Sequence, residues 1–181
     1  MGEPAPEPLH LVQRFVNTYD TEDDRESFTG PDTLRAWLID LELIRPQDRV
    51  DRADVSYAIE TREAVRRMLL GNGGGPADED AVQTVNRAAS RANLTLRFDA
   101  DGSSHLEPLA GGVDGAIGTI LSVAFASMAE GSWTRLKVCP EETCRVAFFD
   151  HSKNRSRRWC SMEVCGNRTK VRAFRARHLE A

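Results

Sequence analysis

The sequence lacks the features that mark several large functional classes. No apolar run approaches the roughly twenty residues of a membrane span, and the acidic, proline-rich opening MGEPAPEP is unlike a secretory signal. We therefore expect a cytoplasmic protein with no membrane partner. The chain has no H-E-x-x-H motif and no recognisable nucleophile–base or acid pair. Its four histidines are His10, His105, His151 and His178. These absences argue against an enzyme.

Cysteine is missing from the first 138 residues, and all four cysteines lie in two C-x4-C pairs separated by fifteen residues. Each pair can bend its own loop around one ion, so the spacing predicts a single structural zinc. A thiol redox site typically uses C-x-x-C, and disulfides need an oxidising compartment. Four unrelated buried cysteines are the alternative. The predicted ligands are Cys139, Cys144, Cys160 and Cys165.

Positive charge is scarce in most of the chain and concentrated at its end. Residues 1–134 carry 12 Lys and Arg against 23 Asp and Glu, a balance of −11. Residues 135–181 carry 12 against 5, a balance of +7. Such asymmetry favours a polyanionic partner for the tail, most often nucleic acid. The alternative is a solvated basic face docked on the acidic body.

The fold class predicted from apolar spacing is α+β and mainly helical, with a helical N-terminal domain over residues 1–132. Period-two segments flank Asp101-Gly102 and predict a small β-hairpin in that domain. The run TEDDRES and the glycine-rich 71–76 are expected to be a polar loop and a flexible connector. Helices are predicted over 8–18, 33–43, 52–70, 78–91 and 113–129.

One arginine, Arg62, falls within the apolar stripe of the helix over 52–70. A paired or snorkelling arginine at a packing seam is one interpretation. An anion or ligand site in the N-terminal domain is the other. In the second case that domain senses a small ligand; it can also mediate oligomerisation as a homodimer.

Residues 133–181 are predicted to form a second domain. WTRLKVC and VAFF read as strands, and a helix is expected from Glu163 to His178 with Cys165 in its first turn. A knuckle, a hairpin and a ligand-bearing helix resemble a treble-clef zinc finger. Because so small a module has little core, we expect the metal to supply much of its folding energy. Metal removal should then unfold residues 135–178 and spare the helical body.

A basic surface is predicted beside the zinc. Three arginines share one face of the final helix, and a basic loop precedes the second cysteine pair. Val171 and Phe174 lie on the neighbouring face, where they are expected to pack against the module or the body. The predicted nucleic-acid contacts are Lys153, Arg155, Arg157, Arg158, Arg168, Lys170, Arg172 and Arg175.

The motifs also carry a family resemblance. CPEETC, DHSKNRSRRWCSMEVCGNR and KVRAFRAR resemble the CGNR zinc finger, including the quartet Cys165–Arg168. FVNT, LRAWL and TREAV, at Phe15–Thr18, Leu34–Leu38 and Thr61–Val65, resemble the ABATE domain that precedes that finger. The resemblance implies a stress-induced transcriptional regulator with DNA as its partner and all four cysteines as zinc ligands.

Two questions stay open at this level. Gly166 and Asn167 are expected to let backbone N–H groups face the thiolates, and this structural role competes with DNA reading by Arg168. The leading hypothesis is a DNA-binding transcriptional regulator. An RNA-binding protein would use the same basic surface, although a stacking-aromatic motif is missing. A protein-interaction adaptor would engage an acidic protein surface instead.

Overall fold

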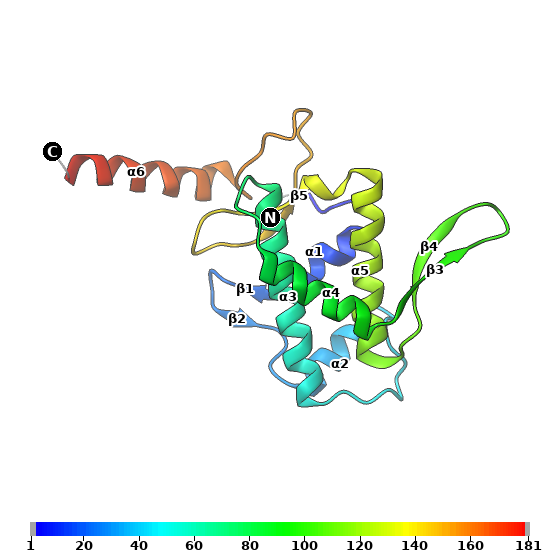
Figure 1. The fold of residues 1–181 in the computed structure, drawn as a ribbon. Helices are drawn as coiled ribbons and strands as arrows, with labels where there is room; N and C mark the ends of the chain where they lie inside the picture. Colours follow the sequence, from blue (N-terminus) through cyan, green and yellow to red (C-terminus); the bar gives the residue numbers. More distant parts are fainter. Residues whose placement is uncertain (1–2, 180–181) are drawn as a thin grey trace.

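The structure, a computed structural model, describes residues 3–179 (Figure 1). The first two residues of the predicted N-terminal domain and the last two of the predicted zinc module lie outside the described residues. The described chain contains six α-helices and three separate two-stranded antiparallel sheets, which confirms the mainly helical α+β class. The helices are α1 (His10–Val16), α2 (Pro31–Asp40), α3 (Arg52–Asn72), α4 (Glu79–Arg91), α5 (Gly112–Glu130) and α6 (Asn167–Leu179). The strands are β1 (Tyr19–Asp20), β2 (Arg25–Glu26), β3 (Leu94–Phe98), β4 (Ser104–Pro108), β5 (Leu136–Val138) and β6 (Ala147–Phe149).

Local signals place the ends of the long helices. Asp51 accepts a hydrogen bond from the backbone N–H of Asp54, whose carboxylate accepts one in return from the Asp51 N–H, so α3 begins with a capping box. Asp78 caps α4 through the N–H of Ala81. Gly131, at φ 78°, ends α5 in the left-handed conformation that glycine adopts without strain.

Helix α5 packs against α1, α3, α4 and strand β4 on the side of the body that carries the β3–β4 hairpin (Figure 1). The expectation that no apolar run approaches a membrane span is wrong for this helix, which by length and composition alone could cross a membrane. Half of it is buried inside the protein, where Ala116, Ile117 and Ile120 are almost fully covered. Its apolar character is therefore explained by packing against the neighbouring helices.

Of the two hairpins in the N-terminal part, the sequence predicts one and misses the other. The hairpin β3–β4 forms as expected, with Gly102 at φ 86° in its turn. After α1 the sequence predicts only a polar loop, but β1 and β2 pair there through two residues each. Strands of two residues are too short to carry an alternating pattern, so periodicity cannot reveal them.

The strands β5 and β6 connect two hydrophobic clusters. Leu136, Val138, Ala147 and Phe149 point into the core of the helical body, whereas Phe148 packs with three buried cysteines in a second cluster. Successive side chains of a strand point to opposite faces, so one short hairpin serves both clusters. The module therefore has little core of its own, as the sequence predicts. Its hairpin belongs to the body's core.

Side-chain hydrogen bonds to backbone groups reinforce this junction. The Asn17 amide donates to the Ala147 carbonyl at 2.9 Å and accepts from the Ala147 N–H at 2.8 Å. Buried Arg66 donates to the carbonyls of Val16 and Arg145 at 2.6 and 2.8 Å, which joins α1 to the residue after the first cysteine pair. These contacts satisfy backbone groups that the short hairpin leaves unpaired.

The guanidinium of Arg62 is 1% exposed and fully engaged with its neighbours. It donates to both carboxylate oxygens of Glu26 at 2.7 and 2.6 Å, to Glu63 at 2.8 Å and to the Thr18 hydroxyl at 3.1 Å. An external anion would have to displace Glu26 to reach it. These contacts match the paired-arginine interpretation, since a bidentate carboxylate already occupies the fork of the guanidinium.

Candidate metal centre and basic surface

The four cysteine sulfurs lie within 4.8 Å of one another. The Sγ atoms of Cys144 and Cys160 are 3.4 Å apart, and those of Cys160 and Cys165 are 3.6 Å apart. A tetrahedral zinc with bonds of about 2.3 Å places its sulfurs roughly 3.8 Å apart. The cluster therefore fits one structural zinc, as the cysteine spacing predicts.

The chemistry of the four sulfurs supports the same conclusion. Hydrogen bonds from the thiols of Cys144 and Cys160 lower the pKa of Cys139 to about 2. The same interaction with Cys139 raises the pKa of Cys144 to about 12. Once one thiolate has formed, it suppresses the ionisation of the sulfurs beside it, so four thiolates coexist only around a cation. Zinc supplies that charge, and four thiolate ligands leave it no open coordination position.

Backbone donors also face the cluster. The backbone N–H groups of Glu141 and Cys160 help to lower the pKa of Cys139, and that of Val146 acts in the same direction on Cys144. Such donors offset thiolate charge around zinc. Arg145, between Cys144 and Val146, takes a left-handed conformation at φ 48°, which turns the chain around the first pair.

The expectation for Gly166 and Asn167 is wrong. The Gly166 N–H donates to the Ser161 carbonyl at 3.0 Å, and the Asn167 N–H donates to the carbonyls of Met162 and Val164. Both groups are used inside the π-helical turn η2 (Met162–Gly166) that precedes α6. A Cβ on Gly166 would lie 2.5 Å from the sulfur of Met162, a flexible and half-exposed side chain that can move aside.

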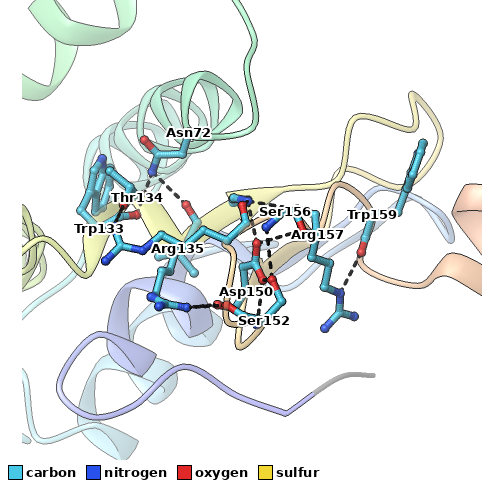
Figure 2. Close-up of polar contacts among 12 residues, drawn as sticks. Asn72, Trp133, Thr134, Arg135, Asp150, Ser152, Ser156, Arg157 and Trp159 are labelled. Carbon is cyan, nitrogen blue, oxygen red and sulfur yellow. Dashed lines mark hydrogen bonds and ion pairs between the residues drawn. The ribbon is translucent and has the colours of Figure 1, made fainter.

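A buried ion pair that the sequence does not reveal lies beneath the basic loop. Lys137 donates to Asp150 at 2.7 Å and to the carbonyls of Arg155 and Arg157 at 2.6 and 3.0 Å. Asp150, fully buried, also accepts from the N–H groups of Ser152 and Arg157, both at 2.9 Å (Figure 2). One lysine and one aspartate thus fix the path of the loop over residues 150–157.

The pKa of Asp150 reflects this environment. Burial alone would raise the pKa, but hydrogen bonds from Lys137 and Ser152 outweigh burial and lower it to about 2. The carboxylate therefore stays ionised at neutral pH, as its pairing with a buried ammonium requires. Arg135 adds two donations, to the carbonyls of Asp150 and Ser152 at 2.9 and 3.0 Å (Figure 2).

The predicted nucleic-acid contacts divide into exposed and engaged side chains. The Arg157 guanidinium donates to the carbonyls of Trp159 and Cys160 and lies 5.0 Å from the centre of the Phe148 ring. It is therefore committed to holding the chain before the second cysteine pair. Among the predicted contacts, the exposed cations that make no ion pair with the described part of the chain are Lys153, Arg155, Arg158, Lys170 and Arg175.

Two arginines of α6 make ion pairs within the protein. Arg168 meets Glu22 of the β1–β2 turn at 2.7 Å, so part of the basic face is docked on the acidic body. Arg172 pairs with buried Glu141 of the first cysteine loop, and this contact lowers the pKa of Glu141. Thr169 donates to the same carboxylate at 3.1 Å. These contacts anchor the start of α6 beside the zinc.

Beyond this anchor, α6 projects away from the rest of the protein (Figure 1). Val171 is 49% exposed and Phe174 is 55% exposed. The expected packing against the module or the body therefore covers these two side chains only in part. Helical periodicity shows which residues share a face, but it does not show whether another element covers that face.

This geometry defines a class of protein, in which four thiolates hold one structural zinc next to a helical domain. Residues 135–178 match the CGNR zinc finger, and residues 9–130 match the ABATE family, described as "Putative stress-induced transcription regulator". Because the second match covers more than half of the chain, the protein belongs to the ABATE family, with a CGNR zinc finger at its C-terminus. A search of curated proteins finds no match.

Proposed function

We propose that the protein is a DNA-binding transcriptional regulator whose zinc finger docks on duplex DNA. The observation that supports this best is the rigid support beneath the basic loop. Zinc and the Lys137–Asp150 pair hold the loop so that Lys153, Arg155 and Arg158 face solvent. An α-helix is about 10–12 Å across and fits a major groove about 12 Å wide, which suits the projecting α6.

Three further parts belong to this proposal. The zinc is structural and the protein is not an enzyme, since a shell of four thiolates leaves the zinc no open coordination position for a substrate. The protein acts in the cytoplasm, where thiols stay reduced and available to zinc. The N-terminal domain senses a ligand or mediates oligomerisation. A groove of about 1310 Å³ between α1 and the zinc module is positioned for such sensing, because ligand there would touch both parts.

Exchanging Lys153, Arg155 and Arg158 together for alanine is expected to weaken duplex binding and reduce its salt dependence. Each phosphate contact contributes about one unit to the slope of log K against log salt, so the slope should fall by about three. Fluorescence anisotropy of a labelled duplex across a salt series measures this. Arg49→Ala, an exposed arginine of the body, is the control and should leave the slope unchanged.

A flat salt response of the unaltered protein would contradict DNA docking through phosphates. The adaptor alternative has one observation in its favour, because Arg168 already donates to a carboxylate of the protein, that of Glu22. Anisotropy with single-stranded RNA and with an acidic peptide, under identical salt, separates the three partners. DNA binding predicts the tightest association with the duplex.

Glu22→Gln is expected to strengthen duplex binding by about two- to fivefold at low salt, the range expected of an exposed ion pair. The substitution releases Arg168 from the body and makes its guanidinium available to phosphate. Asp23→Asn is the matched control. It removes the same charge from the same turn, but native Asp23 pairs with Arg25 and not with Arg168. Equal gains in both variants would mean that only the net charge matters.

A further inference from the structure

The hairpin β3–β4 has one apolar face and one polar face. Its register pairs Leu96 with Leu106 and Phe98 with Ser104 on one side, and Arg97 with His105 on the other. Arg97 also forms an ion pair with Glu107 at 2.6 Å on the polar side. Side chains alternate along a strand, so the apolar face is a continuous strip from the base of the hairpin to its tip.

Only the base of this strip is covered. A Cβ on Gly118 of α5 would lie 2.7 Å from the Pro108 side chain and 3.4 Å from that of Leu94, so the hairpin's base rests directly on α5. Towards the tip, the hairpin leaves α5 and projects on the side opposite to α6 (Figure 1). Leu96 is 51% exposed there and Phe98 is 78% exposed.

Helix α5 carries a second uncovered apolar strip. Phe125 lies two turns after Gly118 on the same face and is 51% exposed, and Met128 nearby is 42% exposed. No charged residue occurs between Gly115 and Ala129. The exposure of Phe98 and Phe125 shows that the hairpin and helix do not cover each other within one chain. An isolated two-stranded hairpin is marginally stable in water, so its outer half gains from a partner.

We infer that a second copy of this chain covers both strips, by reciprocal exchange of the hairpins. In the dimer, the apolar face of each β3–β4 hairpin packs on Phe125 and Met128 of the other copy's α5. A twofold axis needs a self-complementary surface, and two uncharged apolar strips on one chain provide it. The N-terminal part is strongly acidic, so most of its surface repels a second copy. The uncharged strips of two copies can meet without this repulsion.

The exposed area is compatible with a dimer. We take about 200 Å² as the accessible area of each whole side chain. The exposed parts of these strips and of adjoining Leu109 then give a buried area of roughly 1,000 Å² over two copies. This area lies at the lower end of the range for specific interfaces. Because α6 projects on the opposite side from the hairpin, the dimer leaves both zinc fingers free (Figure 1). This deepens the proposed function, which then has two fingers for two DNA half-sites.

Analytical ultracentrifugation of the full zinc-loaded protein, without DNA, tests the dimer. We expect twice the chain mass of 20.1 kDa, and a dissociation constant raised about tenfold or more by Phe98→Ser and by Phe125→Ser. Both side chains are exposed, so neither change should disturb folding, which circular dichroism checks. Val82→Ser alters an apolar residue on α4 that is 43% exposed and should leave the dimer intact.

A photo-cross-linking amino acid in place of Phe98 identifies the segment of the second copy that the hairpin contacts. In a mixture of nitrogen-15-labelled and unlabelled protein, we expect intermolecular cross-links to the 119–130 segment of α5. A monomer at high micromolar concentration would overturn the inference, as would a dimer that both serine variants leave unchanged or that cross-links elsewhere. None of these outcomes involves DNA, so they are distinct from a failure of the proposed function.

Discussion

Removing zinc is expected to disorder the loop of the first cysteine pair, residues 139–146, and residues 150–179. Strands β5 and β6 should stay folded on the body. Structural zinc contributes about 10–16 kcal/mol in zinc-finger peptides at pH 7, which exceeds what the cysteine cluster's small apolar contacts can replace. Leu136, Val138 and Phe149 are buried in the body's core, however, and Asn17 holds the backbone of Ala147. The boundary of unfolding should therefore fall inside the zinc module.

Hydrogen exchange with and without a chelator measures this boundary. Protection should be lost in the 139–146 and 150–179 segments and retained in α3, α5 and both strands. Cys144→Ser should give the same pattern, and Thr143→Ala, an exposed non-ligand of the same loop, should retain zinc and protection. Simultaneous loss of protection in α5 would mean that the whole chain unfolds as one unit. Unchanged protection would mean that zinc does not hold the module.

The parts that the sequence predicts correctly are those with local causes. Paired cysteines bend their own loops, so their spacing alone identifies Cys139, Cys144, Cys160 and Cys165 as one cluster. The long helices follow from apolar periodicity and from caps such as Asp51 and Asp78, which act within one turn. The Asp101-Gly102 turn fixes the β3–β4 hairpin in the same local way.

The features that the sequence does not predict are contacts between residues far apart in the chain. Alternation in LKV and AFF shows two faces, but not that one enters the helical core and the other faces the cysteines. The contact of Arg168 with Glu22 joins residues 146 positions apart, and no local pattern predicts it. Asn17 and Arg66 show the same limitation, because their partners are backbone groups of the distant zinc module.

Charge counting has a related limit. The tail's net charge counts every Lys and Arg equally, but Lys137 is 6% exposed and Arg157 is committed to backbone carbonyls. Arg168 and Arg172 are already paired with carboxylates. The surface available to a polyanion is therefore smaller than the composition indicates. It consists of the loop around Lys153 and the outer part of α6.

Lys137→Met is expected to destabilise the protein by about 3–5 kcal/mol, the range for breaking a buried ion pair from one side. Methionine fills a similar volume, but Asp150 stays buried and loses its ammonium partner. The carbonyls of Arg155 and Arg157 lose a donor as well. Urea denaturation monitored by circular dichroism gives the free energy of unfolding, and hydrogen exchange reports the loop over 150–157.

The same substitution should weaken duplex binding without changing the salt slope, because the exposed cations remain but their spacing is no longer fixed. Lys153→Met is the matched control: it removes an exposed lysine, costs little stability and lowers the slope by about one. Adding Asp150→Asn to Lys137→Met should recover part of the lost stability, since the unpaired buried charge is gone. A cost below about 1 kcal/mol for Lys137→Met would place this pair among ordinary surface contacts. The basic loop would then owe its shape to the zinc ligands alone.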